Sequence, residues 1–203
     1  MTKLSEVKIL GRIGALLSLF VIAPYAGPLI GLVGLVLVFI AVKYIAEETK
    51  NHKIFQDYLM NFILSIIAIG AVIVIMIAAF GISGGFSWIT SLQQKIFTDF
   101  NSFWESFRTI IGGCIVALVI VWVLLVLGAL YLRKSYNRIA EHTKVDLFKT
   151  TGLVYFIGAI TLIIVVGVFI LLVAKILEIV SFFSIPENLP TAPEHPKTET
   201  SSS

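Results

Sequence analysis

The sequence predicts an all-α integral membrane protein, a helical bundle with five transmembrane helices that include two parallel-repeat hairpins. The chain of 203 residues is 58% apolar and only 13% charged, whereas soluble domains carry about a quarter charged residues. Residues 13–42, 58–94, 109–132 and 150–174 contain no Asp, Glu, Lys or Arg. An uncharged apolar stretch beyond about 18 residues is typical of a membrane-spanning helix, and isolated strands cannot satisfy their backbone in lipid.

The first uncharged stretch is too long for one helix, because thirty helical residues would measure about 45 Å against a hydrocarbon core of about 30 Å. Pro24 and Pro28 bracket Gly27 in its middle, and two prolines this close indicate a turn. We therefore expect a tight hairpin, with one kinked helix and four spans as the alternative. The five predicted spans cover residues 7–23, 28–45, 58–81, 108–132 and 150–174.

Loop charge favours five spans over four. With five, one side of the membrane receives eleven of the fifteen basic residues, whereas four spans leave almost no bias. Basic loops stay in the cytoplasm, so we expect a cell-membrane protein with a cytoplasmic amino terminus and an extracytoplasmic carboxyl terminus. The eleven residues are Lys3, Lys8, Arg12, Lys43, Lys50, Lys53, Arg133, Lys134, Arg138, Lys144 and Lys149.

Aromatic residues at the predicted span ends agree with this orientation, because Tyr and Trp gather at the two membrane interfaces. The inner boundary is predicted to hold Tyr44, Tyr58, Tyr131 and Tyr136, and the outer boundary Tyr25, Trp88 and Trp104.

A charged hexamer occurs twice, as IAEETK at 45–50 and IAEHTK at 139–144. Each copy lies between two apolar runs, and the two copies of this helix, loop and helix unit cross the predicted membrane in the same sense. This pattern indicates a duplicated helical hairpin related by an axis along the membrane normal. The acidic and basic residues of each copy are three apart and can pair on a helix. The candidate interaction residues of the repeat are Glu47, Lys50, Phe55, Glu141, Lys144 and Phe148.

The same loops allow a weaker alternative. Glu48 and His52 are four apart, as are His142 and Asp146, so each loop offers an imidazole and a carboxylate that suit a transition metal. The two pairs do not occupy equivalent repeat positions. Solvated loop residues are the simpler interpretation, and we predict no metal and no cofactor.

One domain is predicted over residues 1–185. Within it, the spacing of Leu92, Ile96, Phe100, Phe103 and Phe107 predicts an amphipathic interfacial helix over about 91–107. Residues 186–203 are rich in Pro, Ser, Thr and charge, which predicts a disordered extracytoplasmic tail.

The predicted spans offer little chemistry, because ionisable residues at membrane depth are what enzymes and pumps display. Lys175 and Glu178 are predicted to form an interfacial pair near the outer end of the last span. Small residues such as Gly14 and Ser18, or Gly27 and Gly31, favour close helix contact. We therefore expect a non-enzymatic accessory protein in the lipid bilayer that packs with itself or with a membrane complex, and that binds no nucleic acid. The alternative is a small transporter or channel with a path between the repeated hairpins.

The segments PYAGPLIGLVGLVLVFIAVKYIAEE, KIFQDYLMNFILSIIAIG and LYLRKSYNRIAEHTKVDLFKTTGLVYFIGAI resemble the archaeal membrane proteins grouped as domain of unknown function 996. The resemblance extends over most of residues 7–165. It implies a multi-pass membrane protein and brings neither an established activity nor functional residues.

Overall fold

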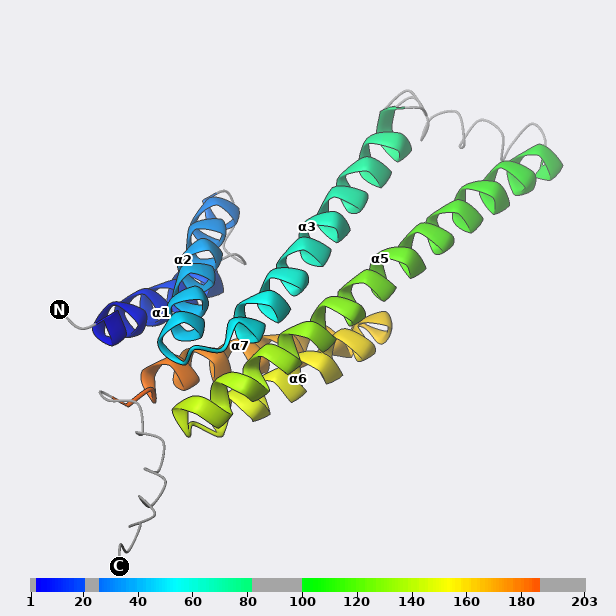
Figure 1. The fold of residues 1–203 in the computed structure, drawn as a ribbon. Helices are drawn as coiled ribbons and strands as arrows, with labels where there is room; N and C mark the ends of the chain where they lie inside the picture. Colours follow the sequence, from blue (N-terminus) through cyan, green and yellow to red (C-terminus); the bar gives the residue numbers. More distant parts are fainter. Residues whose placement is uncertain (1–2, 21–25, 82–99, 187–203) are drawn as a thin grey trace, which may run out of the picture.

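The computed structural model describes residues 3–20, 26–81 and 100–186, which form six α-helices and one short 3-10 helix. The helices are α1 (Lys3–Leu19), α2 (Gly27–Glu48), α3 (His52–Gly81), α5 (Phe100–Thr143), α6 (Leu147–Thr161) and α7 (Val166–Phe183), with η2 (Leu162–Ile164) between the last two. Each helix packs on its neighbour in the chain, and α7 packs back on α1. The six helices thereby close into a ring, from which α3 and α5 project side by side (Figure 1).

The first apolar stretch forms two antiparallel helices, which confirms the predicted hairpin, although the turn residues 21–25 lie outside the described part of the chain. Close packing in this hairpin depends on small residues. A β-carbon on Gly34 would lie 2.3 Å from the backbone nitrogen of Ser18, and one on Gly14 would lie 2.7 Å from the nitrogen of Val38. The predicted pair Gly14 and Ser18 therefore does face the partner helix, as small residues at membrane helix contacts do.

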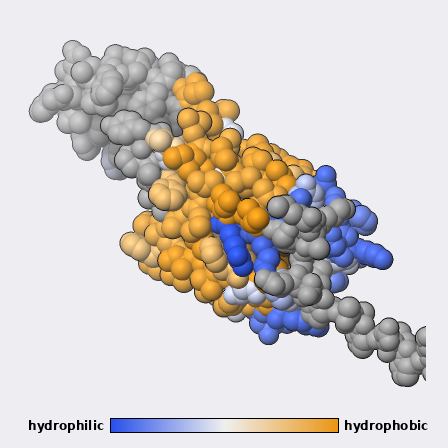
Figure 2. Space-filling view, turned by 90° about the vertical axis from the view of Figure 1, so that its left-hand side faces the viewer, coloured by the Kyte–Doolittle hydropathy of each residue, from blue (hydrophilic) through white to orange (hydrophobic). Residues whose placement is uncertain are grey.

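Within the described residues, five helices are long and apolar enough to cross a membrane, and their candidate spans begin at Leu29, His52, Ile115, Leu147 and Val166. The number of spanning helices agrees with the prediction, but the set of helices differs from the predicted set. The first helix α1 has 17 residues and carries Glu6 and three basic residues, and it is not among the five. The apolar faces of these helices point outward, and Figure 2 shows an apolar belt beside a hydrophilic end.

The predicted single span 150–174 is wrong, because the chain turns back within it. Gly167 approaches α6 so closely that a β-carbon there would lie 2.4 Å from the carbonyl oxygen of Gly158. Val165 completes the turn with a φ of 64°, a left-handed conformation that branched residues rarely adopt. Ending a helix in lipid leaves carbonyls without partners, and the Trp122 indole donates to those of Ala159 (3.0 Å) and Ile160 (3.3 Å).

The turn also changes where the chain ends. The Phe182 ring lies 5.3 Å from the Phe148 ring, and Arg12 donates to the carbonyl oxygen of Phe183 at 3.0 Å. The carboxyl end of α7 is therefore beside the start of α6, at the same end of the bundle as the loop 144–146. The prediction of an extracytoplasmic carboxyl terminus rested on a single span at 150–174. Because α7 returns the chain to the side from which α6 starts, that basis is removed.

The remaining predicted elements lie partly outside the described residues. Of the interfacial helix 91–107, residues 91–99 are not described, and residues 100–107 are the start of α5, which continues without a break to Thr143. The described part is thus the beginning of a 44-residue helix and not a separate element. Of the predicted tail, residues 187–203 lie outside the described part of the chain.

The hairpin contact makes a first prediction. Gly34→Ala should lower the free energy of unfolding by about 1–3 kcal/mol, the usual cost of overpacking, because the new methyl group meets backbone of α1. The matched control is Gly70→Ala on α3, where no heavy atom lies within 4 Å of the added carbon. This control should leave stability unchanged or raise it by up to about 1 kcal/mol through helix propensity. Reversible SDS unfolding measures both variants, and equal effects would contradict the contact.

Candidate functional site

The two repeated hexamers adopt the same local conformation. Thr49 donates to the carbonyl of Ile45 at 2.7 Å, and Thr143 donates to that of Ile139 at 2.8 Å. Each copy then ends its helix with a lysine in the left-handed region, at φ values of 52° for Lys50 and 58° for Lys144. Residues at helix ends adopt this conformation to satisfy the last carbonyls. The hexamers are thus equivalent helix ends, with their Ile and Ala buried in the core.

The candidate interaction residues of the repeat do not converge on a site. Glu47, Lys50, Glu141 and Lys144 are exposed. The ion pairs of the described residues include neither predicted pair, and Glu47 instead lies 4.0 Å from Lys43. The two phenylalanines also differ, because Phe148 is fully buried whereas Phe55 is half-buried against Phe39.

The structure does not bring the two histidine–carboxylate pairs together either. Among the residues that it describes, no group of three His, Cys, Asp or Glu side chains is arranged to hold a metal ion. The Nδ1 atom of His142 instead lies 2.8 Å from the carbonyl of Arg138, one turn earlier in its own helix.

The charged pair on α7 is where polar side chains do converge. The Glu178 side chain is only 2% exposed. Its Oε1 accepts a hydrogen bond from the Tyr136 hydroxyl of α5 at 2.9 Å, and its Oε2 accepts one from the Tyr155 hydroxyl of α6 at 2.6 Å. The Lys175 ammonium lies 2.7 Å from the same Oε2. A buried carboxylate is tolerated only when such donors replace its hydration, and here three helices supply them.

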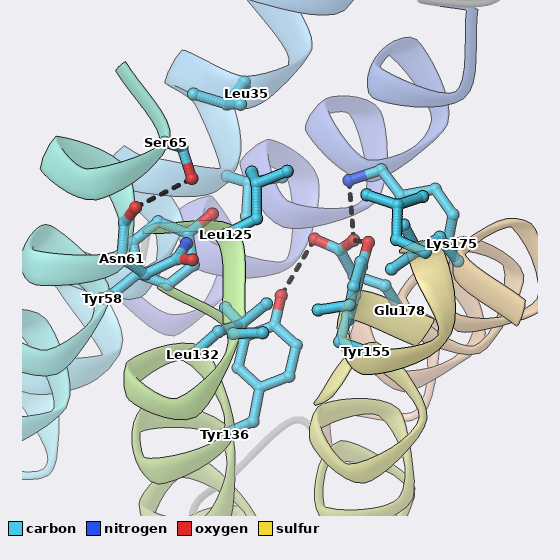
Figure 3. Close-up of a pocket in the computed structure, with 15 residues that line it drawn as sticks. Leu35, Tyr58, Asn61, Ser65, Leu125, Leu132, Tyr136, Tyr155, Lys175 and Glu178 are labelled. Carbon is cyan, nitrogen blue, oxygen red and sulfur yellow. Dashed lines mark hydrogen bonds and ion pairs between the residues drawn. The ribbon is translucent and has the colours of Figure 1, made fainter. Parts of the chain in front are cut away.

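These groups line a pocket of about 230 Å³ between α2, α3, α5, α6 and α7 (Figure 3). The polar lining consists of Tyr58, Asn61, Ser65, Tyr136, Tyr155, Lys175 and Glu178, and the apolar lining includes Leu35, Val38, Leu125, Leu132 and Leu171. Ser65 donates to the backbone carbonyl of Asn61 at 2.8 Å. Helices of α2–α3 and of α5–α6, together with α7, therefore line one small pocket.

Two further contacts hold the walls of the pocket on the side of the charged loops. Arg138 of α5 forms an ion pair with Asp57 of α3, and Ser135 donates to the carbonyl of Ile54 at 2.8 Å. On the opposite wall, the hydroxyls of Thr151 and Ser181 lie 3.0 Å apart between α6 and α7. These bonds join neighbouring helices in pairs, so the positions of Tyr136, Tyr155 and Glu178 are determined together.

The predicted pairing of Lys175 with Glu178 is confirmed, but its predicted place at the membrane interface is wrong. Lys175 and Glu178 were predicted at the outer end of a span, but the reversal of the chain at Val165 places them inside the bundle. Tyr58 and Tyr136 were predicted at the inner membrane boundary, whereas both side chains are buried beside the pocket. The available signal was an acidic residue within an apolar run, since such a residue is by default a functional candidate.

In the described part of the chain, five apolar helices around a buried ion pair define a multi-pass integral membrane protein with a polar pocket within its bundle. Residues 30–176 match the family described as "Protein of unknown function (DUF996)". The chain is 36% identical to the uncharacterized protein MJ1644 of Methanocaldococcus jannaschii over 187 residues, which cover 92% of this chain and 96% of that protein. The chain belongs to the DUF996 family. No solved structure matches it.

The pocket makes a second prediction. Glu178→Gln should lower the free energy of unfolding by about 1–3 kcal/mol, because it leaves the part-buried Lys175 ammonium without its counter-charge. Adding Lys175→Met to that variant should restore part of the loss, so that the two effects fail to add by about 0.5–3 kcal/mol.

The control for this cycle is Asp146→Asn, which removes the exposed partner of Lys149 and should change stability by less than about 1 kcal/mol. SDS unfolding of all variants measures the coupling. Additive effects of the two substitutions in the pocket would show that the buried pair contributes no more than a surface pair.

Proposed function

We propose that this chain is a non-enzymatic membrane protein that binds a small polar solute in the Glu178 pocket and carries it across the bilayer. One observation supports transport above the accessory role that the sequence favours. A buried ion pair and three tyrosines face one pocket lined by helices of both repeated hairpins. Charged groups in a bundle within lipid are costly and mark solute or ion pathways, and transporters place such sites at repeat interfaces.

The same contacts favour binding over catalysis. Both oxygens of Glu178 are occupied by tyrosine and lysine donors, so no free base points at a nucleophile. Ser65 is the serine of the pocket lining, and its hydroxyl donates to the backbone carbonyl of Asn61 in its own helix. An activated nucleophile needs an adjacent base and a third group that orients it. The pocket residues instead offer charges and hydroxyls suited to holding a solute.

The charged loops support a proposed orientation in the cell membrane. The loops 49–51 and 144–146, with their basic neighbours, are proposed to face the cytoplasm under the positive-inside rule. Since α7 ends beside the start of α6, residue 186 is proposed to lie on that side also. The amino terminus is proposed to lie there too, with α1, which packs antiparallel on α2, as a sixth and less apolar crossing. The matching hexamer conformations support the proposal that α2–α3 and α5–α6 are duplicated hairpins.

A second candidate function is an accessory role in a homo-oligomer or a membrane complex. It is favoured by the projecting parts of α3 and α5, where Ile73, Val74, Ile77, Val116 and Leu118 are more than two-fifths exposed. In a membrane these residues face either lipid or another protein.

The transport proposal predicts solute flux in proteoliposomes that hold the full chain. Uptake of methylammonium, acetate and glycerol is compared with that of protein-free vesicles, and at least one solute should enter faster through the protein. Glu178→Gln should lower that flux about tenfold or more, as the loss of about 1.4 kcal/mol of binding would. Lys149→Met, an exposed lysine of α6, is the control and should leave flux unchanged. No flux of any solute, together with stoichiometric co-purification of another protein, would favour the accessory role.

The orientation predicts a labelling pattern in cells. In a Cys114→Ala background, Lys144→Cys and Ser184→Cys should react with a membrane-impermeant maleimide only after permeabilisation. Arg108→Cys, beyond the other end of the α5 span, should react in intact cells. Reaction of Ser184→Cys but not Lys144→Cys from outside would contradict the return of the chain through α7.

A further inference from the structure

The pocket already contains an ammonium group, that of Lys175, beside a carboxylate and an aromatic ring. The Lys175 Nζ atom lies 2.7 Å from Oε2 of Glu178 and 6.0 Å from the centroid of the Tyr155 ring. A carboxylate beside an aromatic ring is the chemistry by which proteins bind ammonium ions. The Lys175 ammonium, which is part of the chain, is thus the kind of group that suits this pocket as a ligand.

The Glu178 and Lys175 side chains are not held equally firmly in the pocket. Glu178 is 2% exposed and is held by the Tyr136 and Tyr155 hydroxyls, whereas the Lys175 side chain is 23% exposed. Lysine also carries its charge on a flexible four-carbon stem that can reach a nearby surface. If the pair separates, Lys175 is the residue that moves, and the charge that stays in the pocket is negative.

Other groups of the pocket suit a cation that replaces the lysine. The Tyr58 hydroxyl and the Asn61 carboxamide line the pocket, and neither makes a hydrogen bond to another residue that the structure describes. Both present oxygen atoms. Glu178 is the one acidic side chain in the pocket lining. Asp57 is not part of that lining and is paired with Arg138. A single carboxylate balances one positive charge, whereas divalent ions normally require more acidic ligands.

We infer that the pocket takes a small monovalent cation of the ammonium type, which displaces the Lys175 ammonium from Glu178. Lys175 is then a built-in competitor that occupies the site when no ligand is bound. This inference rests on the proposed function for the location of the site, and it adds the charge and chemical class of the solute.

The test is calorimetric titration of methylammonium chloride into the purified full chain in nanodiscs, with ionic strength held constant by N-methylglucamine chloride. Lys175→Met removes the competitor while keeping an unbranched apolar side chain, and it should tighten methylammonium binding about tenfold or more, because the competent state is no longer a minor one. Glu178→Gln should abolish binding. Lys149→Met is the control and should bind as the unaltered chain does. Titration of NaCl shows whether the site prefers an ammonium ion to an alkali ion.

A milder variant keeps the inference testable should Glu178→Gln fail to fold. Tyr58→Phe removes one hydroxyl group and keeps the ring, and it should weaken binding roughly threefold to tenfold, the effect of one hydrogen bond. Unchanged affinity in both Tyr58→Phe and Lys175→Met would overturn the inference, as would binding that survives Glu178→Gln. Flux of acetate or glycerol that depends on Glu178, without methylammonium binding, would overturn the cation class while leaving transport intact. Absence of all flux and all binding would overturn both.

Discussion

The burial of one carboxylate constrains much of this bundle. Glu178 loses its water on folding, and its charge is tolerated because Tyr136 of α5, Tyr155 of α6 and Lys175 of α7 donate to it. These donors can meet only if α7 packs on α6 and its Glu178 comes within hydrogen-bond reach of α5. The turn at Val165 is what brings α7 there, so the polar pocket and the reversal of the chain depend on each other.

Close helix contact is achieved by small residues and not by the hydrophobic effect, which does little between helices surrounded by lipid. Gly14 and Gly34 bring α1 and α2 together, and Gly158 and Gly167 do the same for α6 and α7. The two short pairs of helices, α1 with α2 and α6 with α7, are thereby packed beside the long pair α3 and α5. The Trp122 indole, donating to carbonyls at the end of α6, makes the second turn compatible with an apolar surrounding.

These features together describe a protein whose pocket is small, charged and enclosed by helices of different hairpins. The proposed ligand binding has a physical basis, because a bound ion interacts more strongly with a charge at low dielectric than with one in water. The unequal burial of Glu178 and Lys175 determines which charge remains when the pair opens. In the proposed mechanism, the paired carboxylate and the carboxylate bound to a ligand are two states of the same side chains.

Apolar runs, charged loops and the repeated hexamer were enough to predict an α-helical membrane protein, the first hairpin and the helices over 28–45 and 58–81. These features depend on local composition, since lipid requires each spanning segment to satisfy its own backbone. The break of the segment 150–174 was not predictable from local signals, because residues 162–165 contain neither Gly nor Pro. The turn depends on the close contact between Gly158 and Gly167 across α6 and α7, and on Trp122 of α5, which precedes Ala159 by 37 residues. Tertiary structure alone placed Glu178 and its tyrosines together, because donors from three helices meet only after those helices have packed.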